Sequence, residues 1–120
     1  GHLIHKGGTI EGLGAYGAIR NYETVEIDGG TVTSTETTNG FTIYNQKELI
    51  LTSGTVYSSN GRAVQVYENS TFVMNGGLVK TDASNDQAVN LYGDCSATIN
   101  DGTIEGLEYN TAGIAMFGNT

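Results

Sequence analysis

Hydrophobic and polar residues alternate along short segments of the chain, which is the period of two expected of β-strands. Around Phe72 and Met74 this alternation places both side chains on one side of a strand. The next hydrophobic residue of that kind, Val79, follows Met74 after an odd number of residues, so a straight strand would turn it to the opposite side. We therefore expect a bend between them, at Gly77, because glycine adopts the backbone angles of a sharp corner without a Cβ clash.

The order of these segments recurs every 22–25 residues. In the clearest pair, Phe41–Tyr44 matches Val64–Tyr67, and Leu49–Leu51 matches Phe72–Met74, both at an offset of 23 residues. Units start near residues 7, 29, 53, 76 and 101, and residues 1–6 complete a partial unit. The second residue of every unit is a glycine: Gly8, Gly30, Gly54, Gly77 and Gly102. Length changes are confined to one place in each unit, which is typical of a structural repeat with one free loop.

The repeated segments are rich in Val, Ile, Thr and Tyr and are bounded by Gly, Asn, Asp and Ser, which favours strands over helices. The sequence predicts an all-β fold: a single domain over residues 1–120, formed as a right-handed parallel β-helix (a β-solenoid) of about five coils. Asn-Gly pairs such as Asn39-Gly40 also suit an antiparallel sandwich of hairpins. We reject that fold because hairpins would not require the same order of columns in every unit.

Stacked coils place equivalent residues about 4.8 Å apart in columns. One interior column is expected to hold Ile19, Ile43, Val66, Leu91 and Met116. A second interior column is expected to hold Ile10, Val32, Val56, Val79 and Ile104. An aromatic column is expected to hold Tyr44, Tyr67, Tyr92 and Phe117, with Arg20 stacked on Tyr44 at its end.

The chain of 120 residues carries a formal charge of −8, with only five basic residues. These are scattered, so they form no basic stripe, and nucleic acid is not an expected partner. No apolar run approaches the length of a membrane span, so we expect no membrane insertion, and no secretory signal is recognised. We therefore interpret the sequence as a mature product or an excised segment. A single cysteine, Cys95, excludes an internal disulfide framework, and we interpret it as a tolerated small residue.

Candidate catalytic and metal-binding residues do not converge in the expected fold. Glu11 and Glu105 share a column but lie four coils apart, too far for the paired acids of glycoside hydrolysis. Other acids, such as Asp86, are expected to be solvated. His2 and His5 lie on opposite sides of a strand and have no evident third metal ligand. Residues 12–17 fit the dinucleotide fingerprint by letter, but no helix follows. We expect no catalytic residues, no metal and no cofactor, and we expect that the chain is not an enzyme.

The aromatic column is the candidate ligand or packing face. Its tyrosines could stack on sugar rings in a shallow groove, with Asn45 and Asn69 beside them. The same column could instead fill a corner of the solenoid or pack against a neighbouring solenoid.

The two ends of the chain complete each other. Solenoids need polar caps, because an open end exposes strand edges and core side chains, and the sequence shows none. The last unit stops at Thr120, before its next strand, and the segment that begins at His2 supplies a strand of that kind and its corner. Either the segment belongs to a longer solenoid, whose adjacent coils cover its ends, or copies stack head to tail. The residues expected at such a junction are Leu3, Ile4 and His5 at one end and Met116, Asn119 and Thr120 at the other.

The phrases Gly40–Asn45 and Leu49–Val56 resemble the repeats of large right-handed β-helix surface proteins of Gram-positive, often gut, bacteria, which are adhesin-like and have a pectin-lyase-like solenoid. The resemblance implies the fold and an extracellular or cell-surface location. Adhesins, glycan-handling enzymes and structural stalks share this fold, so it does not define a reaction. The expected function is an extracellular structural or adhesive module, with head-to-tail stacking into filaments. The alternative is a glycan-binding or glycan-cleaving module.

Overall fold

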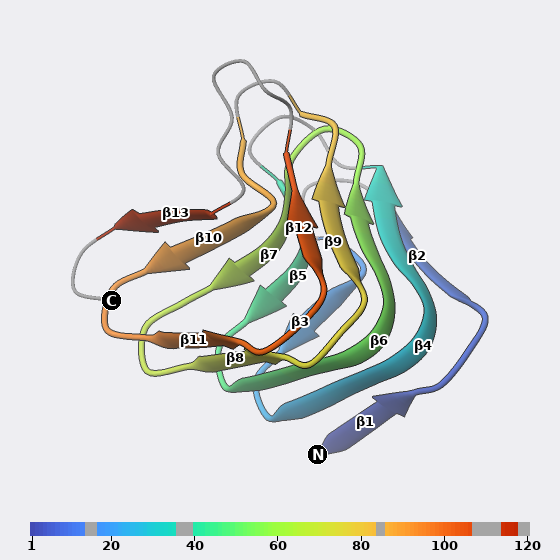
Figure 1. The fold of residues 1–120 in the computed structure, drawn as a ribbon, viewed down its shortest axis with the longest axis horizontal. Coiled ribbons are helices and arrows are strands. Elements are labelled where there is room, and N and C mark those ends of the chain that lie inside the picture. Colours follow the sequence, from blue (N-terminus) through green and yellow to red (C-terminus); the bar gives the residue numbers. More distant parts are fainter. Residues whose placement is uncertain (14–16, 36–39, 84–85, 107–113, 118–120) are drawn as a thin grey trace.

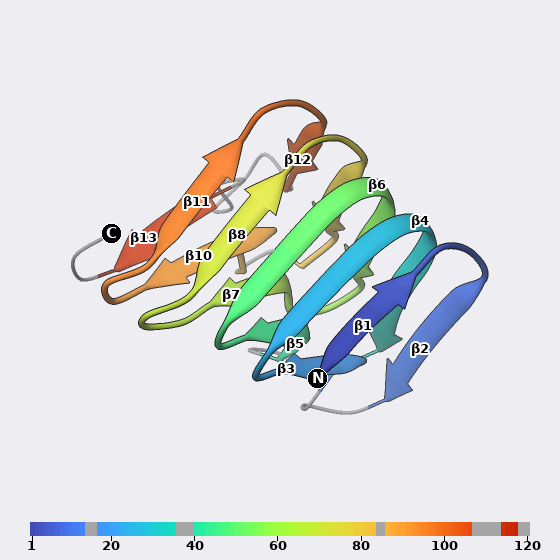
Figure 2. The same ribbon diagram turned by 90° about the horizontal axis from the view of Figure 1, so that it is seen from below.

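The structure, a computed structural model, is a solenoid of parallel β-strands that winds in the right-handed sense (Figures 1 and 2). It describes residues 1–13, 17–35, 40–83, 86–106 and 114–117, and these contain no helix. About four turns separate the first and last strands, and five strands stack on each face of this part of the chain. The predicted fold class is confirmed. No helix in the described ranges is long and apolar enough to span a bilayer.

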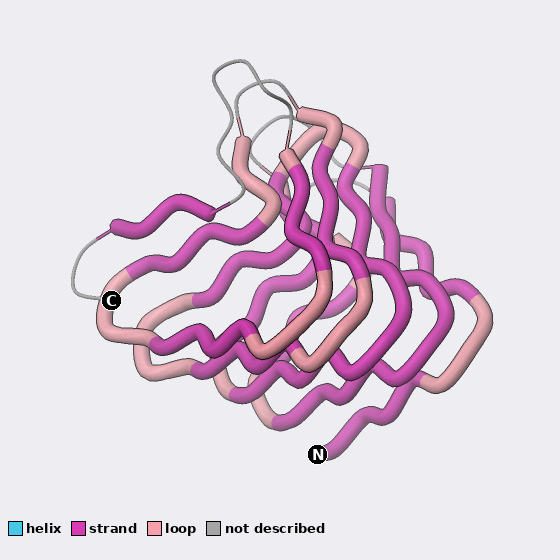
Figure 3. Tube along the Cα trace, in the orientation of Figure 1, coloured by secondary structure: helices cyan, strands magenta, loops and turns pink. Residues whose placement is uncertain are grey.

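Each coil has three faces, as the strand segments of Figure 3 show. Face one consists of β1 (His2–His5), the first part of β4 (Thr24–Thr35), the first part of β6 (Glu48–Ser58), β8 (Thr71–Met74) and β11 (Ser96–Ile99). Face two consists of β2 (Thr9–Leu13), the second parts of β4 and β6, β9 (Leu78–Thr81) and β12 (Thr103–Glu105). Face three consists of β3 (Ile19–Asn21), β5 (Phe41–Asn45), β7 (Arg62–Val66), β10 (Val89–Tyr92) and β13 (Ile114–Phe117).

The core is built from columns of inward side chains that stack in parallel register. On face one, a column runs through Leu3, Val25, Leu49, Phe72 and Ala97. On face two, the predicted column of Ile10, Val32, Val56, Val79 and Ile104 is confirmed. The central members of both columns are buried. Burial of a Leu, Val or Phe side chain contributes about 1.5–3 kcal/mol each, so these columns dominate stability.

The corner between faces one and two turns at the predicted glycines. Gly77, expected at the bend, has a φ of 87°, in the left-handed region that suits glycine. The corner between faces two and three differs from coil to coil. Three residues separate Ser58 from Arg62, whereas seven separate Thr81 from Val89. Coil length therefore varies at this corner, as the sequence predicted. The turn between faces three and one also varies, from two residues after β5 to four after β7, so the expectation that length changes are confined to one place is wrong.

The register of face three differs from prediction at one step. Ile43 pairs with Val64, and Val66 pairs with Asn45, so the expected pairing of Ile43 with Val66 is wrong. Measured between paired residues, the connection before β7 is three residues shorter than the one before β5, and the turn after β7 is two residues longer. Strand β7 therefore lies two residues away from its expected register. An even shift keeps inward residues inward. The other expected pairs of this column are confirmed: Ile19 with Ile43, Val66 with Leu91, and Leu91 with Met116.

Candidate functional site

A row of aromatic rings runs along face three, across the strands. The ring centroids of Tyr44 and Tyr67 lie 5.7 Å apart at 32°, and those of Tyr67 and Tyr92 lie 5.0 Å apart at 5°. The guanidinium carbon of Arg20 lies 5.4 Å from the Tyr44 ring. The predicted contacts of this row are thus present, despite the register shift. Phe117 stands opposite Tyr92 in the backbone register of β10 and β13, as expected.

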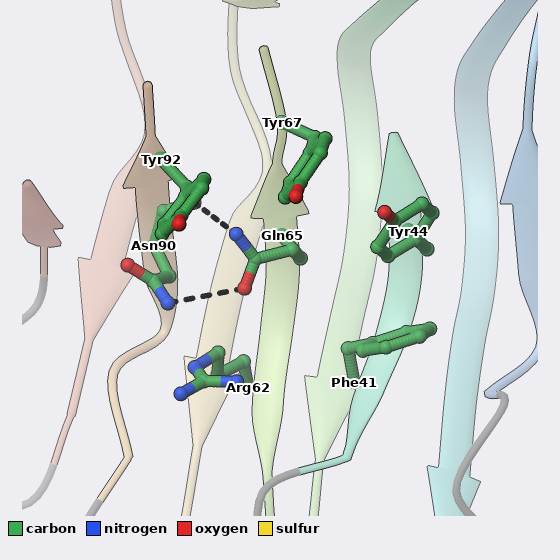
Figure 4. A pocket seen from close by; sticks show the side chains of 7 residues that line it. All are labelled: Phe41, Tyr44, Arg62, Gln65, Tyr67, Asn90 and Tyr92. Carbon is green, nitrogen blue, oxygen red and sulfur yellow. Dashed lines mark hydrogen bonds between the residues drawn. The ribbon is translucent and has the colours of Figure 1, made fainter. Parts of the chain in front are cut away.

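The row borders a groove with a volume of about 390 Å³ (Figure 4). Its lining residues are Phe41, Tyr44, Arg62, Gln65, Tyr67, Asn90 and Tyr92. Phe41 adds a fourth ring, 4.9 Å from Tyr44. The sequence reasoning did not select Phe41, Arg62, Gln65 or Asn90. A two-residue slip of β7 would have identified Gln65 as the neighbour of Tyr44, but nothing in the alternation of the strand signals that slip.

The polar part of the groove is an amide pair on adjacent strands, drawn in Figure 4. Asn90 Nδ2 donates to Gln65 Oε1 at 3.0 Å, and Gln65 Nε2 lies 3.5 Å from the main-chain oxygens of Asn90 and Val66. Both residues are buried, with exposed fractions of 6% for Gln65 and 3% for Asn90. A carbonyl oxygen accepts only, so the atom of Gln65 that faces the two carbonyls is its nitrogen. Its oxygen then requires the nitrogen of Asn90, and the orientation of both amides follows.

Among the described residues that line the groove, only Arg62 is charged, and it forms an ion pair with Asp86. Arg62 lines the groove, and its Nη2 lies 3.6 Å from Oδ1 of Asp86. Asp86 was expected to be a solvated surface acid, and this is wrong, because its side chain is buried against Arg62. The arginine supplies a compensating charge, without which burial of a carboxylate would be costly. The lining contains no carboxylate, so it presents no pair of acids for glycoside cleavage.

The two asparagines predicted beside the tyrosines occupy different places. Asn45 is fully buried and points into the solenoid, where its Oδ1 accepts from Asn21 Nδ2 at 2.8 Å. Its own Nδ2 donates to the main-chain oxygen of Thr71 at 2.9 Å. The expectation that Asn45 belongs to the exposed aromatic face is therefore wrong. Asn69 is exposed, in the turn after β7, and has a left-handed φ of 61° that asparagine tolerates.

Burial perturbs the acidity of Tyr44 and of Cys95. Burial raises the pKa of Tyr44, the neighbouring Tyr67 acts in the same direction, and the hydrogen bond from Gln46 opposes both. Tyr44 therefore remains a protonated phenol at neutral pH. Burial also raises the pKa of the Cys95 thiol. Because the thiolate is the nucleophile, a raised pKa favours the interpretation of Cys95 as a small residue without reactivity.

Strands β1 and β13, which contain the described junction residues, lie at the two ends of the stack in Figure 2. Leu3 and Ile4 are exposed in β1, and His5 Nε2 lies 3.2 Å from the main-chain oxygen of Gly8. Met116 is in β13, opposite Leu91. Asn119 and Thr120 lie outside the described residues. In the described part of the chain, no three His, Cys, Asp or Glu side chains are grouped so that they could hold a metal ion.

Comparison of the chain with protein-family models, curated proteins and solved structures finds no match. The fold defines the class of the protein, a parallel β-solenoid. The two ends of the solenoid and the groove on face three are the features from which a function can be proposed.

Proposed function

We propose that the chain is a structural and adhesive module of an extracellular β-solenoid, and that it is lengthened by stacking of coils on its two ends. This proposal rests on the exposure of core-column side chains at both ends of the solenoid. Leu3 is 43% exposed, although the next member of its column, Val25, is buried. At the other end Ile99 is 40% exposed, although Met74 beside it is buried. The extracellular setting is supported by the resemblance to β-helix surface proteins.

A second copy of the chain offers a suitable surface for either end. In the repeating order of faces, a face-one strand follows β13, so β1 of one copy would stack on β11 of another. This places Leu3 next to Ala97 and His5 next to Ile99, in continuation of two core columns. The first coil carries Lys6 and Arg20, and the last described coil carries Asp94 and Asp101. Two further acids at that end, Asp86 and Glu105, are already paired with Arg62 and Lys80. A head-to-tail contact of this kind does not close on itself and produces filaments.

We expect Leu3→Lys to weaken self-association at least about tenfold, because the junction would bury a lysine in a core column. Analytical ultracentrifugation across a concentration series, with negative-stain electron microscopy, measures this. Ile50→Lys is the matched control, because Ile50 lies on β6, the middle strand of face one, between Glu26 and Val73. Self-stacking is refuted if the wild-type chain stays monomeric throughout, or if Leu3→Lys associates as the wild type does.

We expect Glu11→Lys to strengthen association by a few-fold, up to about tenfold. In the proposed junction Glu11 would face Glu105 of the next copy about 4.8 Å away, and like charges on adjacent strands repel. Lysine at this position would pair with Glu105 instead. Glu48→Lys makes the same change in net charge on β6, the middle strand of face one, and should leave association unchanged. The difference between the two variants should shrink at high salt, and equal effects would contradict the proposed register.

A further inference from the structure

The groove on face three contains a buried hydrogen-bond acceptor without a partner. Asn90 Oδ1 accepts no hydrogen bond in the structure, although the residue is 3% exposed. The amide cannot simply be reversed, because Gln65 Oε1 requires a donor from Asn90. Figure 4 shows the Asn90 nitrogen turned toward Gln65 and the oxygen turned away from it. A buried acceptor of this kind is destabilising, and a ligand that donates a hydrogen bond to it would recover that free energy.

The walls of the groove are aromatic. The Tyr67 and Tyr92 rings are nearly parallel, whereas the rings of Phe41, Tyr44 and Tyr67 are tilted by 39° and 32° in successive pairs. Tilted rings do not cover each other's faces, so part of their π-surface is left for a ligand. Apolar walls with a few fixed polar groups are the general composition of small-molecule sites. Here they suit a molecule with both C–H faces and hydroxyl groups.

Electrostatics favours an uncharged ligand. The positive charge of Arg62, the one charged residue among the described lining residues, is compensated by Asp86. Arg20 lies outside the lining, against the Tyr44 ring. The whole chain carries a charge of −8, which repels polyanionic glycans such as polyuronates. A neutral carbohydrate has the hydroxyl donors that Asn90 Oδ1 lacks and the C–H faces that pack on aromatic rings.

We propose that the groove binds a neutral oligosaccharide, with a sugar hydroxyl donating to Asn90 Oδ1 and sugar rings packing against Tyr44 and Tyr67. The aromatic row crosses β5, β7 and β10, which follow one another about every 4.8 Å along the solenoid axis. An extended oligosaccharide that lies along this axis contacts the whole row, whereas a single sugar contacts only part of it. The site acts by binding alone and is independent of end-to-end stacking.

Binding is tested with four neutral hexasaccharides: maltohexaose, cellohexaose, mannohexaose and xylohexaose. The chain has no tryptophan, so its fluorescence comes from tyrosines, and three of the seven tyrosines line the groove. Calorimetry measures the same binding independently. We expect at least one of the four hexasaccharides to bind with a Kd below about 1 mM, more tightly than the corresponding monosaccharide. Polygalacturonate and tetramethylammonium chloride are the charged comparators. Absence of binding by all four hexasaccharides overturns the proposal, as does binding of only a charged comparator.

Two variants locate the site. Tyr67→Ala removes the central ring and Asn90→Leu removes the acceptor at similar size, and each should weaken binding at least about tenfold. Tyr22→Ala and Asn75→Leu change an exposed tyrosine and an exposed asparagine outside the groove and should bind as the wild type does. Because Asn90 is buried, the wild-type side-chain amide resonance of Asn90 is followed in parallel by NMR. An unmoved Asn90 amide at saturation, or full binding by Tyr67→Ala, overturns the proposed site.

Discussion

Replacement of Gly54 by alanine is expected to lower the free energy of unfolding by about 3–4 kcal/mol. Gly54 turns the corner between faces one and two with a φ of 101°, which side-chain-bearing residues rarely adopt. A Cβ atom at this position would lie 2.8 Å from the main-chain oxygen of Gly30 in the coil below. Gly30 lies between two paired stretches of β4, which end at Asp28 and begin again at Thr31, so it cannot move far without disturbing that pairing. Backbone strain and steric overlap therefore add.

Variants at two other glycines separate the cost of backbone strain from the cost of steric overlap. Gly7→Ala should change stability by less than about 0.5 kcal/mol, because a Cβ there meets nothing within 4 Å and its φ lies outside the left-handed region. Gly8→Ala should cost about 1 kcal/mol, because its φ is 76° but the space around it is open. Urea denaturation followed by circular dichroism measures all three. If Gly54→Ala lowers stability no more than Gly8→Ala does, the close contact between successive corners does not determine the need for glycine at position 54.

Asn45→Ala is expected to cost about 2–4 kcal/mol. The Asn45 amide links three segments inside the solenoid: it accepts from Asn21 Nδ2 and from the main-chain nitrogen of Lys47, and it donates to Thr71. Truncation leaves these groups without the partner and opens a cavity. Asn21 retains its second bond, to the main-chain oxygen of Glu48, which limits the loss.

The matched control for Asn45 is Asn75, whose Oδ1 accepts from Asn100 Nδ2 at 2.8 Å in an exposed position. Water replaces that hydrogen bond, so Asn75→Ala should change stability by no more than about 0.5 kcal/mol. Chemical denaturation of both variants against the wild type is the measurement. Similar costs at the two positions would show that the internal amide pair of Asn21 and Asn45 is not a main support of the corner.

The sequence pattern predicted faces one and two well because the corner between them has a constant length. Leu49 and Phe72 pair at the same offset as Val56 and Val79, since no loop intervenes between those strand segments. Face three lies between two turns of changing length, and the register there depends on how the turns share the difference. A shift by two residues leaves the alternation of inward and outward residues intact, so periodicity could not reveal it.

The candidate site was predicted only in part, for related reasons. The tyrosines were found because aromatic residues recur at the end of the same strand. Gln65 and Asn90 pair in the predicted register, since they directly precede Val66 and Leu91, but alternation alone does not distinguish a paired buried amide from any other polar residue. Asn45 was assigned to the exposed face because a polar residue at the end of a strand usually faces water. Here it is buried, with its amide satisfied by a second asparagine and by main-chain groups.

The variable corner between faces two and three has a consequence for how such a chain can change. Three residues between Ser58 and Arg62, and seven between Thr81 and Val89, connect equivalent strands. The strands of faces one and two keep their pairing in both coils. Added residues at this corner therefore lengthen the loop and leave the stacked columns undisturbed. A foreign peptide grafted between Thr81 and Val89 would be displayed along one ridge of a scaffold whose interior remains unaltered.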